Sequence, residues 1–456
     1  MTTHEAAPKQ GDGIKAEALE RVWPITSKVD DSDIHEKHLW VGGVNVSKLP
    51  KTTTSPLFIY DEEHIRTRLR EYRDGMAAHT DRFRISYAAK AFFCKAMSAI
   101  VEEEGCNLLV CSGGEIAIAE AAGFPMERIV FHGNNKSEDE IAMAIMNGVG
   151  IIIVDNLDEI TKIDLNADLF DAKPRVMIRL RAGIHADTHT YLQTADEDSK
   201  FGISIASGEA MEATKAVLDS EHIELAGFMA HIGSQIFNLE PYEKEVEVVM
   251  DFANKVREEL GYTADEIDLG GGLGIAYTKD EEPPSIEHYT KLICDKMKGY
   301  CEQIGFPMPL VALEPGRSIV GNAGVTCYRA GAPKTIEGVR TFVPVDGGMS
   351  DNIRTALYGA EYEAIVANKA FYPRTDVYTI VGKHCESGDV LIENASLQPC
   401  EEGDTICIFA TGAYCYSMSS NYNSATKPAV AFVKDGKYRT VLRAQTYEDL
   451  MSCEVE

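Results

Sequence analysis

A regular alternation of strand-like and helix-like segments between residues 84 and 317 constrains the fold most strongly. Short apolar runs predict eight strands, at residues 85–89, 108–111, 129–132, 150–154, 176–181, 225–231, 266–269 and 311–314. Helical patterns separate most of them, most clearly at 115–122, 139–147, 209–218, 242–260 and 286–305. Such an alternation over roughly 230 residues is typical of a (β/α)8 barrel of the TIM type. An open doubly wound sheet has the same alternation and is the alternative.

Polar side chains stand at the carboxyl ends of the predicted strands, and this distribution favours the barrel. They are Lys90, His132, Asn134, Asn135, Asp155, Arg179, Arg181, His231, Glu314 and Arg317, together with a glycine run after residue 269. In a closed barrel these ends meet at one mouth, where active sites are built. A lone histidine or arginine is more often structural, but packing does not explain the same pattern at strand after strand.

Strand-like runs without regular helices follow residue 317 and predict a second, mostly β domain with a sandwich-like or barrel-like form. They lie at 341–345, 377–382, 405–410, 429–433 and 437–442, and one predicted helix, 359–368, interrupts them. The predicted domains are a flexible extension at 1–36, strands at 37–60 that join the β domain, the barrel at 61–317, and the β domain at 318–456. The first turn of a helix from 61 to 76 is acidic, and Ser137 with Glu140 forms a capping box before another.

Composition excludes several classes of protein. The formal net charge of −28 argues against nucleic acid and anionic membranes as partners. No apolar run is long enough to cross a bilayer, and residues 1–8 do not resemble a secretory signal. The 11 cysteines include no CxxC pair, so we expect no disulfide framework, no metal site and a reducing cytoplasmic location.

The residues at the predicted barrel mouth match the needs of one cofactor. Lys90 follows a strand among small residues, where partial desolvation would make its amine a usable nucleophile; alternatively its stem packs while its ammonium reaches water. Glycines 270–272 would let backbone amides approach a phosphate, or would simply form a tight turn. His231 could stack on a planar ring, Ser234 could donate to the phosphate, and Glu314 could accept a proton from a ring nitrogen. An amine, a phosphate loop, a stacking ring and this carboxylate together indicate pyridoxal 5'-phosphate.

The chain resembles the fold type III, alanine-racemase-like pyridoxal-phosphate decarboxylases in stretches that run in order from about residue 40 to 430. They are Tyr-Ala-Ala-Lys-Ala at 87–91, Ser-Gly-Gly-Glu at 112–115, His-Gly-Asn-Asn-Lys-Ser at 132–137, Asp-Ser-Lys-Phe-Gly at 198–202, His-Ile-Gly-Ser-Gln at 231–235, Gly-Gly-Gly-Leu-Gly at 270–274, Glu-Pro-Gly-Arg at 314–317, Asp-Asn-Ile-Arg at 351–354 with Tyr358, Cys-Glu-Ser-Gly-Asp at 385–389, and Gly-Ala-Tyr at 412–414. The members it resembles most convert meso-2,6-diaminopimelate to L-lysine and carbon dioxide, the last step of lysine biosynthesis.

The resemblance implies a role for each matching residue. Lys90 would bind the cofactor covalently, His231 would stack on its ring and Glu314 would protonate its nitrogen, while Ser234, Gly271 and Gly272, with Tyr414 nearby, would bind its phosphate. Arg317, Arg354 and Tyr358, again with Tyr414, would hold the far carboxylate of the substrate and Glu386 its far ammonium, and Cys385 would return a proton to the α-carbon. The resemblance also implies a homodimer in which Cys385 and Glu386 of one subunit complete the barrel site of the other.

Three alternatives differ in substrate or activity. The chain could decarboxylate ornithine, arginine or carboxynorspermidine, although the stretches at 351–354 and 385–389 fit a substrate with a second carboxylate and ammonium. A racemase would need an opposing base on the other face of the ring. A non-catalytic pyridoxal-phosphate-binding homologue would have lost Lys90, Cys385 or the phosphate glycines, and all of these are present.

Overall fold

The chain divides into two compact units in a computed structural model that describes residues 11–29, 38–184 and 199–455. The barrel unit contains Thr67–Gly274 and Pro283–Ser318, and the β unit contains Met1–Arg66, Ile275–Glu282 and Ile319–Glu456. Compared with the predicted barrel, 61–317, residues 61–66 and 275–282 belong to the β unit. The predictions for residues 1–10, 30–37 and Asp198 lie outside the described residues.

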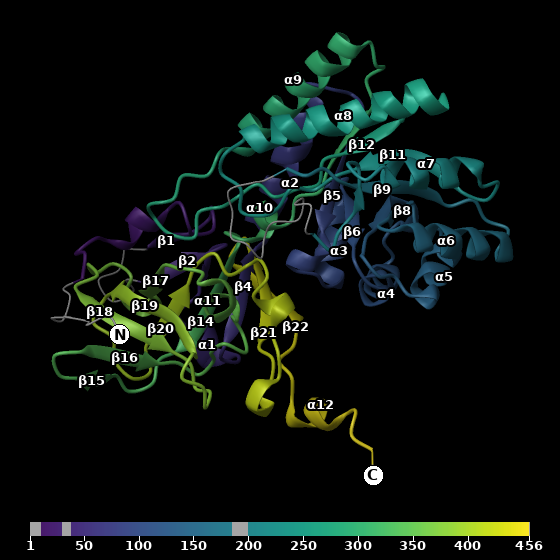
Figure 1. Ribbon diagram of the computed structural model, residues 1–456. Helices are drawn as coiled ribbons and strands as arrows, with labels where there is room; N and C mark the ends of the chain where they lie inside the picture. The colour runs from purple at the N-terminus through teal and green to yellow at the C-terminus, as the bar shows by residue number, and fades with distance from the viewer. Residues whose placement is uncertain (1–10, 30–37, 185–198, 456) are drawn as a thin grey trace. The chain divides into compact units, whose positions relative to one another are not determined.

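Eight parallel strands form a closed sheet in the barrel unit (Figure 1). They are β5 (Phe83–Ala88), β6 (Asn107–Val110), β7 (Ile129–Phe131), β8 (Ile151–Val154), β9 (Arg175–Arg181), β11 (Glu224–Met229), β12 (Glu266–Asp268) and β13 (Leu310–Leu313); the short β10 (Ile203–Ser204) pairs with β9. Each strand pairs with its neighbours in this order, and β13 pairs with β5 to close the ring. Closure confirms the predicted barrel and rules out the open sheet.

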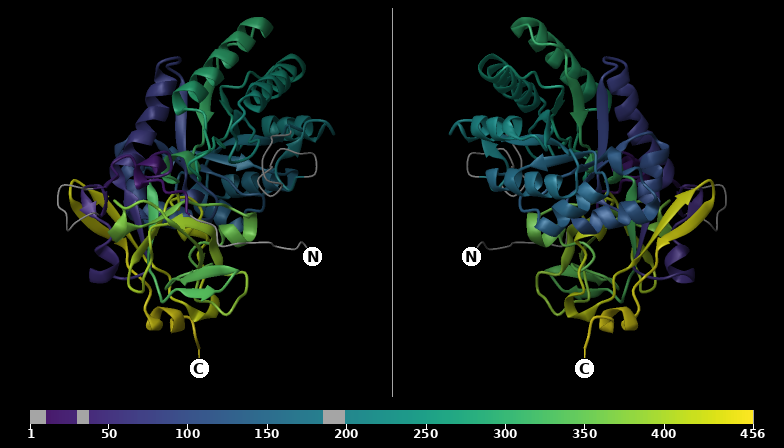
Figure 2. Two further views of the ribbon diagram at one scale, coloured as in Figure 1. Left: turned by 90° about the vertical axis from the view of Figure 1, so that its left-hand side faces the viewer. Right: turned by 90° about the vertical axis from the view of Figure 1, so that its right-hand side faces the viewer.

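Helices lie outside the ring of strands (Figures 1 and 2). They are α2 (Glu62–Ala77), α3 (Lys95–Glu103), α4 (Gly113–Ala122), α5 (Glu138–Met146), α6 (Leu157–Leu169), α7 (Glu209–Asp219), α8 (Glu240–Leu260) and α9 (Ile286–Ile304), with the short α10 (Arg317–Val320) after β13. In α8, Val246, Val249, Met250, Ala253 and Val256 are buried at the spacing of one helical face. The predicted capping box of Ser137 and Glu140 is present at the start of α5.

Three sheets make up the β unit. The three-stranded sheet has the order β1 (Lys28–Val29), β2 (Leu39–Val41), β3 (Val44–Asn45). The six-stranded sheet has the order β17 (Ala364–Val366), β20 (Thr405–Ile408), β14 (Gly324–Arg329), β4 (Leu57–Asp61), β21 (Ala429–Lys434), β22 (Lys437–Leu442). The four-stranded sheet has the order β15 (Lys334–Ile336), β16 (Arg340–Pro344), β18 (Asp376–Val381), β19 (Val390–Leu397). The short helices are α1 (Leu49–Thr52), α11 (Arg354–Tyr358) and α12 (Tyr447–Met451). The central place of β4 in the six-stranded sheet confirms that an N-terminal strand joins the β domain.

The N-terminal segment departs from its prediction. Residues 11–29 were expected to be flexible, but Leu19, Val22 and Trp23 are buried in the core of the β unit. Gly11 and Gly13 donate backbone hydrogen bonds to the carbonyl groups of Thr375 and Arg374. The prediction of a flexible extension is therefore wrong for residues 11–29, because their few apolar side chains are enough to anchor them.

Two further predictions for the β unit are wrong. The predicted helix at 359–368 is β17 at Ala364–Val366, because this stretch pairs with β20 instead of forming helical turns. Cys327 and Cys407 form a disulfide, although no such bond was expected. These two cysteines lie directly opposite each other in the antiparallel pair of β14 and β20, with 4.3 Å between their Cα atoms.

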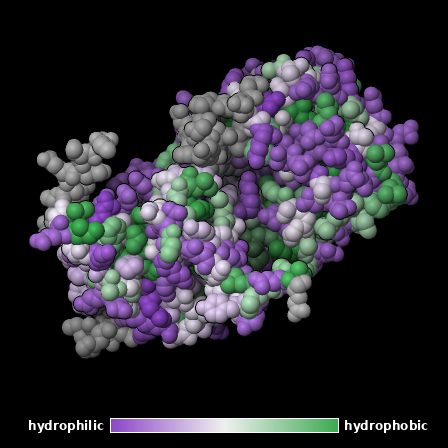
Figure 3. All heavy atoms as spheres, turned by 60° about the horizontal axis from the view of Figure 1, so that its bottom comes forward, coloured by the Kyte–Doolittle hydropathy of each residue, from purple (hydrophilic) through white to green (hydrophobic). Residues whose placement is uncertain are grey.

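One face of the molecule is mostly polar (Figure 3). On the face drawn in Figure 3, hydrophilic residues predominate and the hydrophobic residues form small, separated patches. Within residues 11–29, 38–184 and 199–455, the helices are too short or too polar to span a membrane. The same residues contain no group of three or more histidine, cysteine, aspartate or glutamate side chains arranged to hold a metal ion.

Candidate active site

Lys90 stands in a single 3₁₀ turn, Ala89–Ala91, that directly follows β5 at the barrel mouth. The neighbouring alanines at 88, 89 and 91 are buried, but the Lys90 side chain is exposed, so the predicted partial desolvation is wrong for the chain as described. Burial is the main influence on the pKa values of Glu115, His231 and Glu314, and the charge of Lys90 is a further influence on each. The amine is therefore close enough to act on groups that follow three other strands, β6, β11 and β13.

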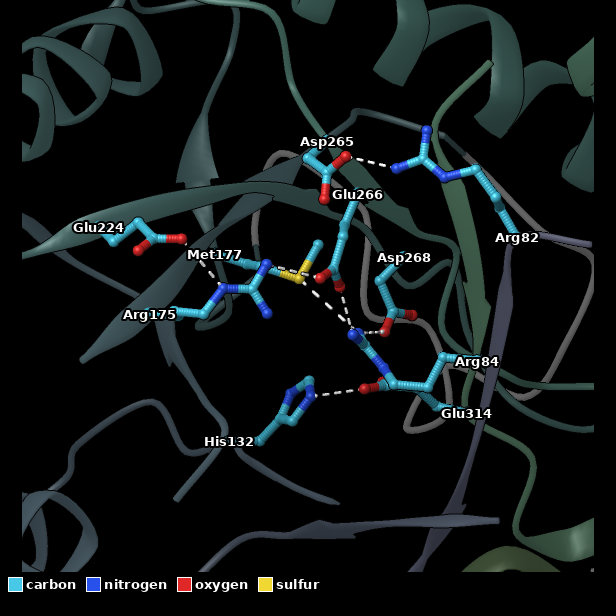
Figure 4. Close-up of polar contacts among 10 residues, drawn as sticks. All are labelled: Arg82, Arg84, His132, Arg175, Met177, Glu224, Asp265, Glu266, Asp268 and Glu314. Atoms are coloured by element: carbon cyan, nitrogen blue, oxygen red, sulfur yellow. Dashed lines mark hydrogen bonds and ion pairs between the residues drawn. The ribbon is translucent and has the colours of Figure 1, made fainter. Parts of the chain in front are cut away.

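His132 and Glu314 form a buried pair across the barrel mouth (Figure 4). The Nε2 atom of His132 lies 2.8 Å from Oε1 of Glu314. Burial lowers the pKa of His132 well below its usual value, so the ring is neutral and can donate its single N–H to the carboxyl oxygen. Burial raises the pKa of Glu314 to about 7, so this carboxyl group can gain or lose a proton near neutral pH.

His231 packs against the glycine loop that follows β12. Its Nδ1 atom accepts a hydrogen bond of 3.3 Å from the N–H of Gly271. A Cβ atom on Gly270 would lie 2.7 Å from the same nitrogen, and Gly270 has a φ of 62°, so the ring needs glycine beside it. Burial, and then the charge of Lys90, lower the pKa of His231 well below its usual value, which keeps the ring neutral.

The glycine loop itself leaves no room for side chains. A Cβ atom on Gly271 would lie 2.3 Å from the carbonyl oxygen of Glu314, and one on Gly272 would lie 2.4 Å from that of Gly233. Gly272 also has a φ of 108°, which other residues rarely adopt. Backbone of this kind forms a cradle that a phosphate can approach closely.

Ser234 and Arg317 lie side by side. The Nε and Nη2 atoms of Arg317 donate to the hydroxyl oxygen of Ser234 at 3.2 and 2.9 Å. Gln235, the next residue, has a φ of 63°, an unfavourable conformation for a residue with a side chain. A hydroxyl, a guanidinium and a glycine cradle suit a phosphate, and a lysine amine, a neutral imidazole and a carboxyl group suit a pyridine ring with an aldehyde. The barrel mouth therefore fits pyridoxal phosphate.

The other predicted site residues belong to the β unit, where Arg354 lies in a cage of tyrosines. Its guanidinium carbon is 4.7 Å from the ring centre of Tyr277, 5.9 Å from that of Tyr358 and 5.8 Å from that of Tyr362. Its Nη1 atom donates to the Tyr362 hydroxyl at 2.6 Å. The cage orients a buried cation next to Tyr358, its predicted neighbour in substrate binding.

Cys385 and Glu386 lie on an exposed turn that Asp389 organises. The Asp389 carboxylate accepts from the N–H groups of Met349, at 2.6 Å, and of His384, at 2.9 Å. The backbone N–H of Cys385 donates to the side chain of Asn423 at 3.2 Å. The thiol and the Glu386 carboxylate are thus exposed on a turn whose backbone is fixed at both ends.

Tyr414 is half-buried in the β unit and has a φ of 61°. The left-handed conformation is costly for a tyrosine, by about 1–3 kcal/mol. Strain of this size is often kept where a side chain must point in one direction for function.

Some residues of the barrel mouth were not predicted as part of the site. The sequence places His132 and Arg179 at strand ends without indicating a role. In the structure, His132 bonds to Glu314, and Arg179 is buried 3.6 Å from Asp155. Arg84 and Asp268 were not singled out, and they form a buried ion pair inside the barrel. Charged residues at every second position of a barrel strand, which face its interior, are the signal that could have revealed them.

Comparisons with known proteins agree with this geometry. Residues 62–321 match the family model described as pyridoxal-dependent decarboxylase, pyridoxal binding domain. The chain is 42% identical to diaminopimelate decarboxylase of Bacillus subtilis over 92% of this chain and 95% of that protein. It is 41% identical to the enzyme of Mycobacterium tuberculosis over 95% of this chain and 98% of that protein.

Solved structures give the same result. The crystal structure of diaminopimelate decarboxylase from M. jannaschii superposes with a TM-score of 0.88 at 31% identity, covering 95% of this chain and 98% of that one. The enzyme from Helicobacter pylori in complex with L-lysine superposes with a TM-score of 0.81 at 30% identity, covering 90% and 98%. With its barrel, its pyridoxal-type mouth and these relatives, the chain belongs to the diaminopimelate decarboxylases of the pyridoxal-dependent decarboxylase family.

Proposed function

We propose that this protein decarboxylates meso-2,6-diaminopimelate to L-lysine and carbon dioxide with pyridoxal phosphate as its cofactor. The observation that carries the proposal is the barrel mouth, where Lys90, His231, Glu314 and the glycine loop come together. Relatives at about 40% identity over nearly the whole chain support the choice of substrate.

The residues of the barrel mouth would hold the cofactor. Lys90 would bind its aldehyde carbon, and the neutral ring of His231 would pack on its ring. Gly271, Gly272 and the Ser234 hydroxyl would bind its phosphate. When bound, pyridoxal phosphate withdraws electrons from the bond that breaks as carbon dioxide leaves.

Glu314 would hold a proton at the pyridine nitrogen. Its carboxyl group titrates near neutral pH because it is buried, and the N–H of neutral His132 keeps it in place at 2.8 Å. A carboxylate that holds this proton keeps positive charge on the ring during the reaction.

Residues of the β unit and Arg317 would recognise and protonate the substrate. Arg354, Tyr358 and Arg317, with Tyr414, would bind the far carboxylate, because an arginine fork fits a carboxylate with two hydrogen bonds. Glu386 would bind the far ammonium group. The Cys385 thiol would donate its proton to the α-carbon.

The close contact of Arg317 with Ser234 also suits a role at the phosphate. At 2.9 Å, the guanidinium is near enough to share a ligand with the Ser234 hydroxyl. We therefore infer that Arg317 could neutralise phosphate charge as well as face the substrate.

We also propose a homodimer that works in the cytoplasm, with Cys385 and Glu386 of each subunit completing the site of the other. Both residues lie on an exposed turn, which makes them accessible to a second copy of the chain.

A substrate panel tests the function. Purified enzyme loaded with pyridoxal phosphate should release carbon dioxide from meso-diaminopimelate and form L-lysine, with little release from ornithine, arginine or carboxynorspermidine. Preference for one of these would make the chain a decarboxylase of another amino acid. Inversion of the substrate without carbon dioxide would indicate a racemase, and cofactor binding without turnover would indicate a non-catalytic homologue.

A further inference from the structure

A row of charged side chains lies in the barrel interior on the side of Asp268 and Glu314 (Figure 4). Arg175 Nη2 lies 2.8 Å from Oε1 of Glu266, whose other carboxyl oxygen pairs with Arg84. Arg84 Nη2 then lies 3.2 Å from Oδ2 of Asp268. The exposed fractions of the Arg84, Glu266 and Asp268 side chains are only 9%, 4% and 0%.

The strand register explains how this row of charged side chains forms. Arg84 on β5 and Asp268 on β12 are both partners of Ala312 on β13, so the three residues share one level of the barrel. The small side chain of Ala312 leaves space for Arg84 to reach Asp268. Glu314 follows Ala312 by two residues and therefore points to the same face, towards the mouth.

Burying a row of charged side chains in a barrel is energetically unfavourable compared with apolar packing. The interior of a (β/α)8 barrel is normally packed with bulky branched apolar side chains. Buried ion pairs lose hydration, and well-packed apolar residues in their place are often equally stable or more so. Stability alone is therefore a weak reason for these charges.

Their position connects them to Glu314. Asp268 Oδ1 accepts from the N–H of Gly270 at 2.8 Å, and the N–H of Glu314 donates to the carbonyl oxygen of the same glycine at 2.6 Å. Burial, and then the charge of Glu314, raise the pKa of Asp268 to about 7. Burial raises the pKa of Glu314 as well. The charge of Arg84 is the strongest influence that lowers it, and a hydrogen bond with the Asp268 side chain also lowers it. Ionised Asp268 and Arg84 thus act on one carboxyl group with opposite charges, whereas protonated Asp268 favours the ionised form of Glu314 through its hydrogen bond.

We propose that Arg84 and Asp268 are positioning residues that control how firmly Glu314 holds the proton at the pyridine nitrogen of the cofactor. Above the pKa of Asp268, its negative charge strengthens the hold, and the positive charge of Arg84 limits it. The inference rests on the function proposed above for Glu314.

Other charged or titratable groups also surround Glu314 and must be kept constant in any test. They are Lys90 after β5, Cys111 after β6, His132 after β7 and Arg179 on β9. Arg84 and Asp268 differ from Lys90, Cys111 and His132 in lying within the strands at the level of Ala312, away from the open mouth. Arg179 shares this level, because it and Asp268 are both partners of Met229.

The test measures the proton at the nitrogen directly. Enzyme loaded with pyridoxal phosphate labelled with ¹⁵N in the ring is titrated with base, and the nitrogen resonance gives the pH at which the ring loses its proton. Asp268→Asn should lower this pH by about one unit or more, a tenfold change in the equilibrium. Arg84→Met should raise it or keep the nitrogen protonated to the end of the titration, and Arg84→Lys, which retains the charge, should stay near the wild type.

The pair Arg82 and Asp265 supplies matched controls. It joins the residue before β5 to the residue before β12, so it lies at the other end of the same two strands, and both side chains are about half exposed. Arg82→Met and Asp265→Asn should leave the titration unchanged. If Asp268→Asn and Arg84→Met shift the titration in the same direction, or no more than these controls, the two residues only fill space and the inference is wrong.

A Glu314→Gln variant separates this inference from the proposed function. If that variant leaves the nitrogen resonance unchanged, Glu314 does not bind the ring nitrogen and the proposed role fails first. If Glu314→Gln changes the resonance and Asp268→Asn does not, the proposed role stands and only the inference about Arg84 and Asp268 is overturned. Unfolding of the cofactor-free variants, followed by circular dichroism, checks that each is folded.

Discussion

At the scale of single residues, the phosphate loop depends on glycine. Gly272→Ala places a Cβ atom 2.4 Å from the carbonyl oxygen of Gly233 and forces alanine to a φ of 108°. We expect the affinity for pyridoxal phosphate to fall by about 5- to 150-fold, because strain of this kind costs about 1–3 kcal/mol. Titration of the cofactor-free enzyme measures it.

The control is Gly299→Ala in α9, where a Cβ atom meets nothing within 4 Å. It should leave cofactor affinity unchanged and stabilise the helix by about 0.5–1 kcal/mol. An affinity for Gly272→Ala equal to that of this control would show that the loop does not hold the phosphate.

Glu245 gives a prediction about pH. Both its carboxyl oxygens are buried and have no hydrogen-bond partner among the described residues, and burial, followed by the charge of Asp268, raises its pKa well above the usual value. The folded protein keeps the proton where the unfolded chain releases it, so stability falls as pH rises above about 4.5 towards the folded pKa.

Relative to wild type, Glu245→Gln should gain up to about 1.4 kcal/mol of stability per pH unit over that interval. Denaturant unfolding of both proteins at several pH values measures the gain. Glu259→Gln, at an exposed position of the same helix, should run parallel to wild type. A Glu245→Gln curve that also runs parallel would contradict the buried, protonated carboxyl group.

The site could be predicted only in part, for a physical reason. Lys90, His231 and Gly270 to Gly272 stand in local patterns that a short stretch of sequence displays. The partnership of Glu314 with His132 spans 182 residues and is created by closure of the barrel. A short stretch of sequence does not reveal such a contact, so the sequence does not predict the bond between His132 and Glu314.

At the scale of elements, residues 11–14 lie beside β18, and we expect this contact to stabilise the β unit. Arg374 is fully buried and pairs with Asp12 and with Glu363, at 2.9 Å from the latter. Asp12→Ala should lower the free energy of unfolding by about 2–3 kcal/mol, because it leaves a buried guanidinium with one partner.

The matched control is Arg21→Ala, which breaks the exposed pair of Arg21 with Glu282 in the same unit. Exposed pairs contribute little, so this change should stay within about 0.5 kcal/mol. Equal effects of Asp12→Ala and Arg21→Ala would mean that the N-terminal segment adds nothing specific to stability.

The barrel was more predictable than the β unit. Each barrel strand is a short apolar run between helical patterns, so the sequence marks it clearly. The sequence does not predict β14, β15 or β19, and it predicts a helix where β17 lies, because mixed polar and apolar stretches of the β unit have no clear period. Pairing with β4, β18 and β20 decides the structure of β14, β17 and β19. The partners of β14 and β17 lie far away in the sequence, whereas β18 lies just before β19.

At the scale of the whole molecule, Lys90 belongs to the barrel unit and Cys385 to the β unit. If each active site takes these residues from different subunits, Lys90→Ala and Cys385→Ala proteins are each nearly inactive. Unfolded and refolded together, they should regain up to roughly a quarter of wild-type activity, because about half the dimers are mixed and each of these has one intact site. Co-refolded protein as inactive as its parents would mean that each site is built within one chain.

The position of the cofactor on the chain decides whether the chemistry is centred on Lys90. The loaded enzyme is reduced with borohydride, digested and analysed by mass spectrometry, with Lys90→Ala treated in parallel. We predict a pyridoxyl group on Lys90, none on the nearby Lys95 or on Lys136, which is buried after β7, and none on the Lys90→Ala protein. A pyridoxyl group on any other lysine of the wild type, or on no lysine at all, would contradict the proposed site.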